Sequence, residues 1–139
     1  MAGHCETFDH TADVGLTARA DSPGELLEAL AGCMCDLVCP RRNVAPDSTR
    51  AIAVEAPDFE ALTVDFLEAV LGAIQIDRFA VSSIKITGAT QTKAQAELLG
   101  TDLDPRRHEI LTEIKAVTYH ELEVVRHGGQ WTARVILDL

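Results

Sequence analysis

The sequence predicts an α+β fold in which two amphipathic helices pack on a largely antiparallel or mixed sheet of about seven strands. Two segments carry apolar residues at helical spacing, and about seven short segments alternate between apolar and polar residues. The helices and strands do not alternate strictly along the chain, which argues against a doubly wound parallel sheet. With 139 residues, the chain is expected to form one domain over residues 1–139.

The first third of the chain predicts two short strands followed by a well-capped helix. Residues 5–8 and 14–20 are expected to be the strands. Ser22 can cap the helix, Pro23 suits its first position, and Glu25 completes a capping box. The apolar stripe of this helix consists of Leu26, Leu27, Leu30, Cys33, Met34, Leu37 and Val38.

The middle of the chain predicts a strand, a second helix and a pair of neighbouring strands. Residues 49–56 alternate as a strand, and Asp58 is a candidate cap for the helix that follows. In that helix apolar residues recur every four positions. Residues 81–88 and 91–98 both alternate with a period of two, so we expect them to pair.

The last third predicts a polar loop and two long strands. The loop covers residues 100–108, and the strands, within residues 113–139, are joined at His127-Gly128-Gly129. Alternation in the final strand separates Asp138 from the apolar face. That face consists of Trp131, Ala133, Val135, Leu137 and Leu139.

Charge and hydropathy exclude some classes of function. The chain carries 22 acidic and 12 basic residues, a net charge of -10, which argues against unaided binding to nucleic acid and suits cations or a basic protein partner. No apolar run reaches the roughly 18 residues of a membrane span, and the first residues do not resemble a signal peptide. We therefore expect a cytoplasmic protein with no membrane partner.

The four cysteines do not have the spacing of a structural zinc site. Cys33, Cys35 and Cys39 form a C-x-C-x3-C pattern, and Cys5 lies far from them in the sequence. Zinc sites usually combine a closely spaced cysteine pair with a second pair or with spaced histidines. The prediction is that these cysteines are reduced thiols of the core.

Acidic residues occur at both ends of the chain, within otherwise apolar segments. Asp13 belongs to "FDHTADVGL" near the start, and Asp138 belongs to "ARVILDL" at the end. Taken alone, an aspartate before a strand is commonly a turn residue, and one near a chain end is commonly solvated. Spacing alone does not assign a role to either carboxylate.

Three segments together resemble the archease family: "DHTADVGL", "KAVTYHELEV" and "WTARVILDL". The similarity is strongest over residues 9–16 and 100–139. The second helix is less similar, because the family tends to carry more aromatic residues there. The resemblance implies a non-catalytic activator of an RtcB-type RNA ligase, which promotes the ligase's GTP-dependent guanylylation and multiple turnover in tRNA splicing and RNA repair.

The resemblance also implies a divalent-cation site made of Asp13, Asp138 and the main chain of Leu139. Calcium is the expected ion, with magnesium or manganese as alternatives, because all three accept carboxylate and carbonyl oxygens. Ligands this far apart in the sequence require the first and last segments to lie side by side. RNA would be met only indirectly, through the ligase as partner.

Other polar residues have alternative interpretations. Lys115 is either a partner or nucleotide contact or a solvated lysine, and His10 and His120 either orient the carboxylates or are structural histidines. In the polar loop, Asp102, Asp104 and His108 indicate turn chemistry first and a docking edge second.

Two other classes of function stay open from the residues. One is a stand-alone metal-dependent hydrolase, although the H-E-x-x-H motif is absent from the sequence. The other is a general chaperone or binding module, with which an acidic single domain is also compatible.

Overall fold

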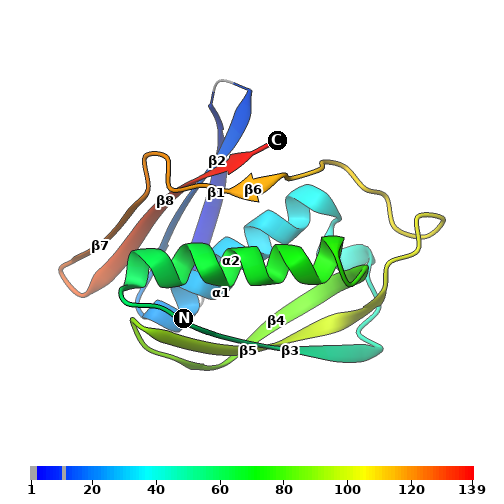
Figure 1. Ribbon diagram of the computed structural model, residues 1–139, viewed down its shortest axis with the longest axis horizontal. Helices are drawn as coiled ribbons and strands as arrows, with labels where there is room; N and C mark the ends of the chain where they lie inside the picture. The colour runs from blue at the N-terminus through cyan, green and yellow to red at the C-terminus, as the bar shows by residue number, and fades with distance from the viewer. Residues whose placement is uncertain (1–2, 11) are drawn as a thin grey trace.

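Two antiparallel sheets enclose a pair of helices, as Figure 1 shows for the computed structural model, which describes residues 3–10 and 12–139. The larger sheet has the order β1-β2-β8-β6, with β7 also pairing with β8. The smaller sheet has the order β3-β5-β4. Each sheet therefore has the helices on one of its faces.

The elements follow one another along the chain without strict alternation. The larger sheet consists of β1 (His4–His10), β2 (Asp13–Ala20), β6 (Ala116–Val117), β7 (Glu123–His127) and β8 (Gln130–Asp138). The smaller sheet consists of β3 (Ser48–Glu55), β4 (Phe79–Ala89) and β5 (Lys93–Asp102). The helices are α1 (Pro23–Val38), the short 3-10 helix η1 (Arg41–Asn43) and α2 (Phe59–Gln75).

The α+β class is confirmed, and within residues 3–10 and 12–139 the strands number eight in two sheets. Both helix starts are as predicted. The Ser22 hydroxyl accepts from the Glu25 backbone N–H at 3.2 Å, and the Asp58 carboxylate accepts from the Ala61 N–H at 2.8 Å. The predicted pairing of residues 81–88 with 91–98 is also confirmed, as the antiparallel β4–β5 pair.

The prediction of one long strand within residues 113–127 is wrong. That segment forms only β6 and β7, separated by a turn. The Thr118 hydroxyl donates to the Ile136 carbonyl at 2.9 Å and accepts from the His120 N–H at 3.2 Å, which turns the chain away from β8. Glu121 then has a φ of 51°, in the left-handed region that interrupts a strand.

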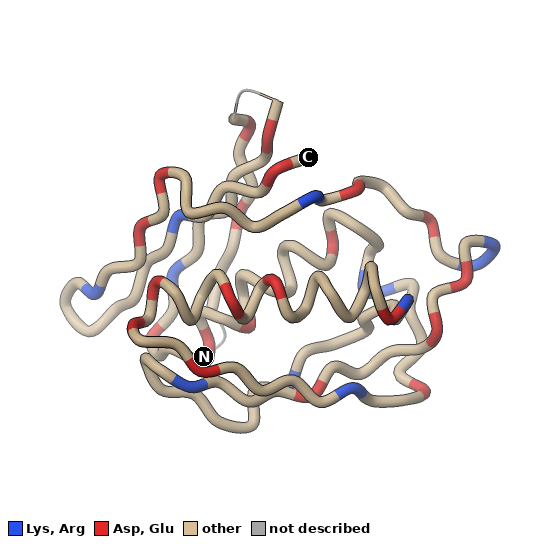
Figure 2. Tube along the Cα trace, viewed as in Figure 1, with Lys and Arg blue, Asp and Glu red and all other residues tan. Residues whose placement is uncertain are grey.

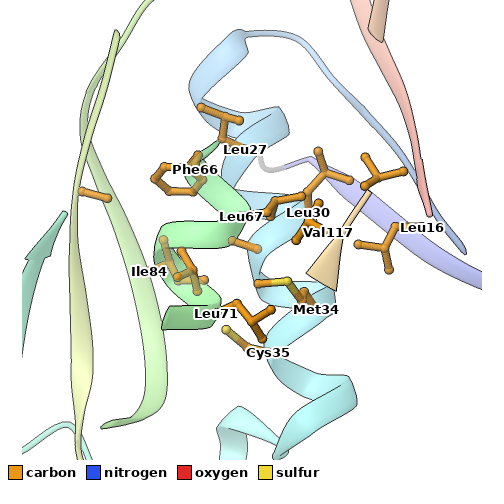
Figure 3. Packing of buried hydrophobic residues seen from close by; sticks show 14 of the residues in the cluster. Leu16, Leu27, Leu30, Met34, Cys35, Phe66, Leu67, Leu71, Ile84 and Val117 are labelled. Atoms are coloured by element: carbon orange, nitrogen blue, oxygen red, sulfur yellow. The ribbon is translucent and has the colours of Figure 1, made fainter. Parts of the chain in front are cut away.

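The core lies between the helices and on the inner faces of both sheets (Figure 3). Leu27, Leu30 and Met34 of α1 face Phe66 and Leu67 of α2 there, and all five side chains are fully buried. Packing of this kind leaves the apolar faces of both helices covered, as their periodicity predicts. The predicted stripe of α2 is buried along its whole length: Leu62, Phe66, Leu67, Val70, Leu71 and Ile74.

Candidate cation site

Asp13 and Asp138 are direct partners across the β2–β8 pair. The register joins His10 of β1 to Asp13, Asp13 to Asp138, and Asp138 to Ala116 of β6. Side chains of directly opposite residues in an antiparallel pair point to the same face of the sheet. The chain therefore brings its first and last strands together and places both carboxylates on one face, beside the His10 imidazole.

This face is the one turned away from the helices. Leu16 and Leu137 point into the core and are fully buried. By strand alternation Asp13 and Asp138 point to the opposite face of the sheet, where they are half-buried. The predicted alternation of the last strand is confirmed by the burial of Trp131, Ala133, Val135 and Leu137. In Figure 2, the acidic segments of the β1–β2 hairpin lie near the acidic segment that precedes the C-terminus.

A small layer of side chains covers the same face next to the carboxylates. The Phe8 ring lies over Gly15, where a Cβ atom would collide with the ring. The Arg134 guanidinium stacks on Phe8, with 4.5 Å from Cζ to the ring centroid. Ile136, on the outward-facing side of β8, is only 1% exposed. Glycine at position 15 is therefore what lets the aromatic ring close this layer.

The segment with Lys115 lies along Asp138. The Lys115 N–H donates to the Asp138 carbonyl at 2.7 Å, and the lysine side chain is exposed. The carboxylate of Glu68 on α2 accepts from the Val117 N–H at 2.8 Å and so ties this segment to the helix. Leu139 follows Asp138 directly in the chain. It is half-buried and packs against the core, which limits the movement of its main chain.

His10 contacts two carboxylates, one on each side of its ring. Its Nε2 lies 2.7 Å from Oε2 of Glu121, and its Nδ1 lies 3.8 Å from Oδ2 of Asp13. His120 Nε2 lies 3.2 Å from the same Oε2 of Glu121. The hydrogen bond from His10 lowers the pKa of Glu121, and the positive charge of Arg134 acts in the same direction.

The chemistry of the donor set fits a hard divalent cation. Two carboxylates on one face and a neighbouring main-chain carbonyl are oxygen ligands of the kind that calcium, magnesium and manganese accept. Opposed like charges across a strand pair are unfavourable without a compensating cation. The register places Asp13 and Asp138 side by side, with Leu139 next in the chain, as the site implied by the resemblance requires.

Sequence reasoning missed Glu121 and Arg134. Arg134 Nη2 lies 3.5 Å from Oε1 of Glu121, so this carboxylate links the β8 strand to His10 and His120. Glu121 directly follows His120 in "YHEL", and a carboxylate next to a candidate histidine was the available signal. Its role depends on the turn after Thr118, which the strand prediction excluded.

The polar loop is explained by turn chemistry. Asp104 accepts from the Arg106 N–H at 3.0 Å, and its own N–H donates to Nδ1 of His108 at 2.9 Å. His108 is 5% exposed and is therefore a structural residue. Asp102 is the last residue of β5 and is exposed.

All four cysteines are free thiols, as predicted, but the expectation that all of them are buried in the core is met only by Cys35 and Cys39. Cys35 and Cys39 are buried, whereas Cys5 and Cys33 are half-buried. These two half-buried cysteines lie on the wall of a surface pocket of about 400 Å³ between β1 and α1. Burial raises the pKa of Cys35 to about 12, so this thiol stays protonated at neutral pH.

Comparison with known proteins shows which family the chain is similar to. The model of the archease protein family (MTH1598/TM1083) matches residues 5–139. "Protein archease" of Pyrococcus abyssi is 33% identical over 138 residues, covering 96% of this chain and 97% of that protein. "Protein archease" of Methanopyrus kandleri is 34% identical over 137 residues, covering 96% of this chain and 98% of that protein.

Solved structures agree with the fold. The solution structure of Methanobacterium thermoautotrophicum protein 1598 has a TM-score of 0.80 and 28% identity, covering 97% of this chain and 98% of that one. A crystal structure from Thermotoga maritima, described as an archease and possible chaperone, has a TM-score of 0.69 and 23% identity, covering 96% of both chains. Across the described residues, no helix is long and apolar enough to span a membrane. The match of the family model to nearly the whole chain, together with relatives above 30% identity, shows that the chain belongs to the archease family.

Proposed function

We propose that this protein is a non-catalytic activator of an RtcB-type RNA ligase in the cytoplasm. It promotes the GTP-dependent guanylylation of the ligase and its multiple turnover in tRNA splicing and RNA repair. Membership of the archease family supports an accessory role. The observation that carries the proposal is the cross-strand pairing of Asp13 with Asp138, which puts two carboxylates from distant parts of the sequence on one face.

The cation site is proposed to consist of Asp13, Asp138 and the main chain of Leu139, with calcium as the preferred ion. Calcium takes six to eight oxygens at about 2.3–2.6 Å, more than these three residues supply. The rest of the shell is left to water or to groups of the partner. A partly filled shell at the edge of a sheet suits a site that is presented to another protein.

The electrostatics of the chain support an indirect role toward RNA. A net charge of -10 repels phosphate backbones, so the ligase and not this protein is expected to hold the RNA. A divalent ion bound at the site would supply charge stabilisation for phosphoryl oxygens during guanylyl transfer. Asp13 and Asp138 would hold that ion.

Lys115 is proposed to contact the ligase or its nucleotide. Its side chain is exposed, and its backbone is fixed by the hydrogen bond to the Asp138 carbonyl. A lysine presented next to an acidic site adds one positive charge within the same contact surface. Lys115→Ala should weaken stimulation of the ligase while leaving cation binding unchanged.

The test is a guanylylation and sealing assay with purified ligase under multiple-turnover conditions. Wild-type protein should increase turnover, and both Asp13→Asn and Asp138→Asn should abolish that increase with the fold retained by circular dichroism. Asp47→Asn is the matched control, because Asp47 is exposed and lies in the segment before β3. Full stimulation by both site variants would disprove the role of the carboxylate pair.

The same preparation distinguishes the two other classes of function. Turnover of phosphoester substrates by the protein and metal alone, without ligase, would identify a hydrolase. Broad suppression of aggregation without ligase stimulation would identify a chaperone, the role suggested for the Thermotoga maritima protein. We expect neither result.

A further inference from the structure

We propose that His10, His120 and Glu121 form a second metal site, which takes a borderline transition ion such as Zn²⁺ or Co²⁺ and is distinct from the carboxylate site. One ligand atom from each of these residues lies within 4.8 Å of the other two. The proposal concerns different ligands and a different class of ion from the proposed activator function, and it does not depend on that function.

The distances match what a tetrahedral ion requires. Metal–nitrogen and metal–oxygen bonds of about 2.0–2.2 Å place neighbouring tetrahedral ligands about 3.4 Å apart. Glu121 Oε2 lies 2.7 Å from His10 Nε2 and 3.2 Å from His120 Nε2. Small side-chain rotations are therefore enough to admit an ion between the three atoms.

The hydrogen-bonding of His10 favours a cation at this position. Its Nδ1 is buried and has no hydrogen-bond partner among the described residues; the nearest acidic oxygen, Asp13 Oδ2, is 3.8 Å away. A neutral ring protonated on Nε2 would leave the Nδ1 lone pair facing that carboxylate. A neutral ring protonated on Nδ1 would leave the Nε2 lone pair facing Glu121. A metal ion at Nε2 leaves the ring proton on Nδ1, where it faces the Asp13 carboxylate, and so suits both sides of the ring.

A metal at Nε2 also gives Asp13 the usual position of an outer carboxylate. Ligating histidines commonly donate their other ring N–H to a carboxylate, which fixes the tautomer and the orientation of the ring. Asp13 lies on the Nδ1 side of His10, opposite Glu121. This places Asp13 between the two sites, as an oxygen ligand of the carboxylate site and a positioning residue for His10.

The remaining contacts orient the third ligand and leave one side of the site open to solvent. Arg134 lies 3.5 Å from Oε1 of Glu121, so Oε2 is the oxygen turned toward both histidines. The side chains of His120 and Glu121 are 63% and 45% exposed, so one face of the site is open to solvent. Three protein ligands with an open fourth position are the arrangement that keeps a site accessible to an exogenous ligand.

Cobalt binding to the untagged full chain tests the proposal, with visible absorption reporting tetrahedral coordination. Wild-type protein should bind one Co²⁺ at this site and exchange it for Zn²⁺. His120→Ala and Glu121→Gln should each weaken binding about tenfold or more, and both side chains are exposed enough for the fold to be retained. His127→Gln is the matched control, because His127 is an exposed histidine at the β7–β8 turn.

Three outcomes of the cobalt experiment would overturn the proposal, and Asp138→Asn supplies a fourth. The first is wild-type cobalt binding by His120→Ala and Glu121→Gln. The second is an equal loss of binding in His127→Gln. The third is an intense near-ultraviolet charge-transfer band, which would assign the cobalt to cysteine thiolates. Asp138→Asn separates the two sites, because it should retain cobalt while losing calcium, and loss of both ions would show a single shared site instead.

Discussion

Asp13 and Asp138 oppose each other directly across the β2–β8 pair, which places two negative charges side by side where the first and last strands meet. Strand pairing holds them there without a cation. The pair therefore raises the free energy of the folded chain when no ion is bound, and this can be measured apart from any partner protein.

Neutralising one member of this pair should stabilise the protein in the absence of metal. Asp13→Asn or Asp138→Asn should raise the free energy of unfolding in chelator by about 0.2–1 kcal/mol, the usual size of a like-charge cross-strand penalty. In calcium the order should reverse, because only the wild-type site gains binding energy. Urea unfolding in both conditions measures this, and lower stability of both variants in chelator would refute it.

Gly15→Ala should destabilise the protein by about 1–3 kcal/mol, as other overpacked substitutions do. The added methyl group would collide with the Phe8 ring, which in turn supports Arg134. Gly88→Ala in β4 is the control, because its Cβ would meet only Gln95 Oε1, at 3.6 Å. Partial recovery in the double variant Gly15→Ala/Phe8→Leu would locate the strain, whereas equal effects of the two single glycine substitutions would contradict it.

Cys35 should make the protein less stable as the pH rises above about 9. Burial raises the pKa of this thiol from 9.0 to about 12, so in that interval the unfolded chain loses the proton and the native chain keeps it. The free energy of unfolding then falls by at most about 1.4 kcal/mol per pH unit from this one group, and below pH 9 its contribution is fully present.

Cys35→Ala is the variant that isolates this effect. It should be less stable at neutral pH, because a buried side chain is shortened, but its stability should fall less steeply between pH 9 and 12. Chemical unfolding at a series of pH values gives both slopes. Identical slopes for the two proteins would show that Cys35 does not cause the alkaline loss.

Glu68→Ala should loosen the segment that runs beside Asp138. The substitution leaves the Val117 N–H without its carboxylate acceptor, at a cost of about 1–3 kcal/mol, and should reduce ligase stimulation through Lys115. Glu68→Gln keeps an acceptor oxygen and should recover most of the stability. Asp65→Ala, an exposed position on the same helix, is the control, and a similar loss there would point to the helix and not to the Val117 contact.

The sequence predicted the parts of this structure that depend on local signals. Ser22 and Asp58 were identified as caps because side-chain oxygens bond backbone donors three residues away. The pairing of the first and last segments followed from the resemblance to a family with ligands at both ends. Neither composition nor periodicity could supply that long-range contact, since strand partners are not encoded in either strand alone.

The parts that escaped prediction depend on tertiary contacts. The turn after Thr118 is stabilised by the Ile136 carbonyl of a distant strand, so the alternating pattern of residues 113–127 was misleading. Glu121 reached His10 through that turn, at a sequence separation of 111 residues. Its importance could be recognised only from coordinates.

The register that joins β2 to β8 has one more consequence, for the energetics of ion capture. Both aspartates are fixed by main-chain hydrogen bonding of a central strand that also pairs with β6 and β7. The entropy cost of bringing the two oxygen donors together is therefore part of the folding free energy, and an ion binds to donors that are already in position. Loop-borne ligands would have to be ordered by the ion itself, so this architecture should favour tight capture with little structural rearrangement.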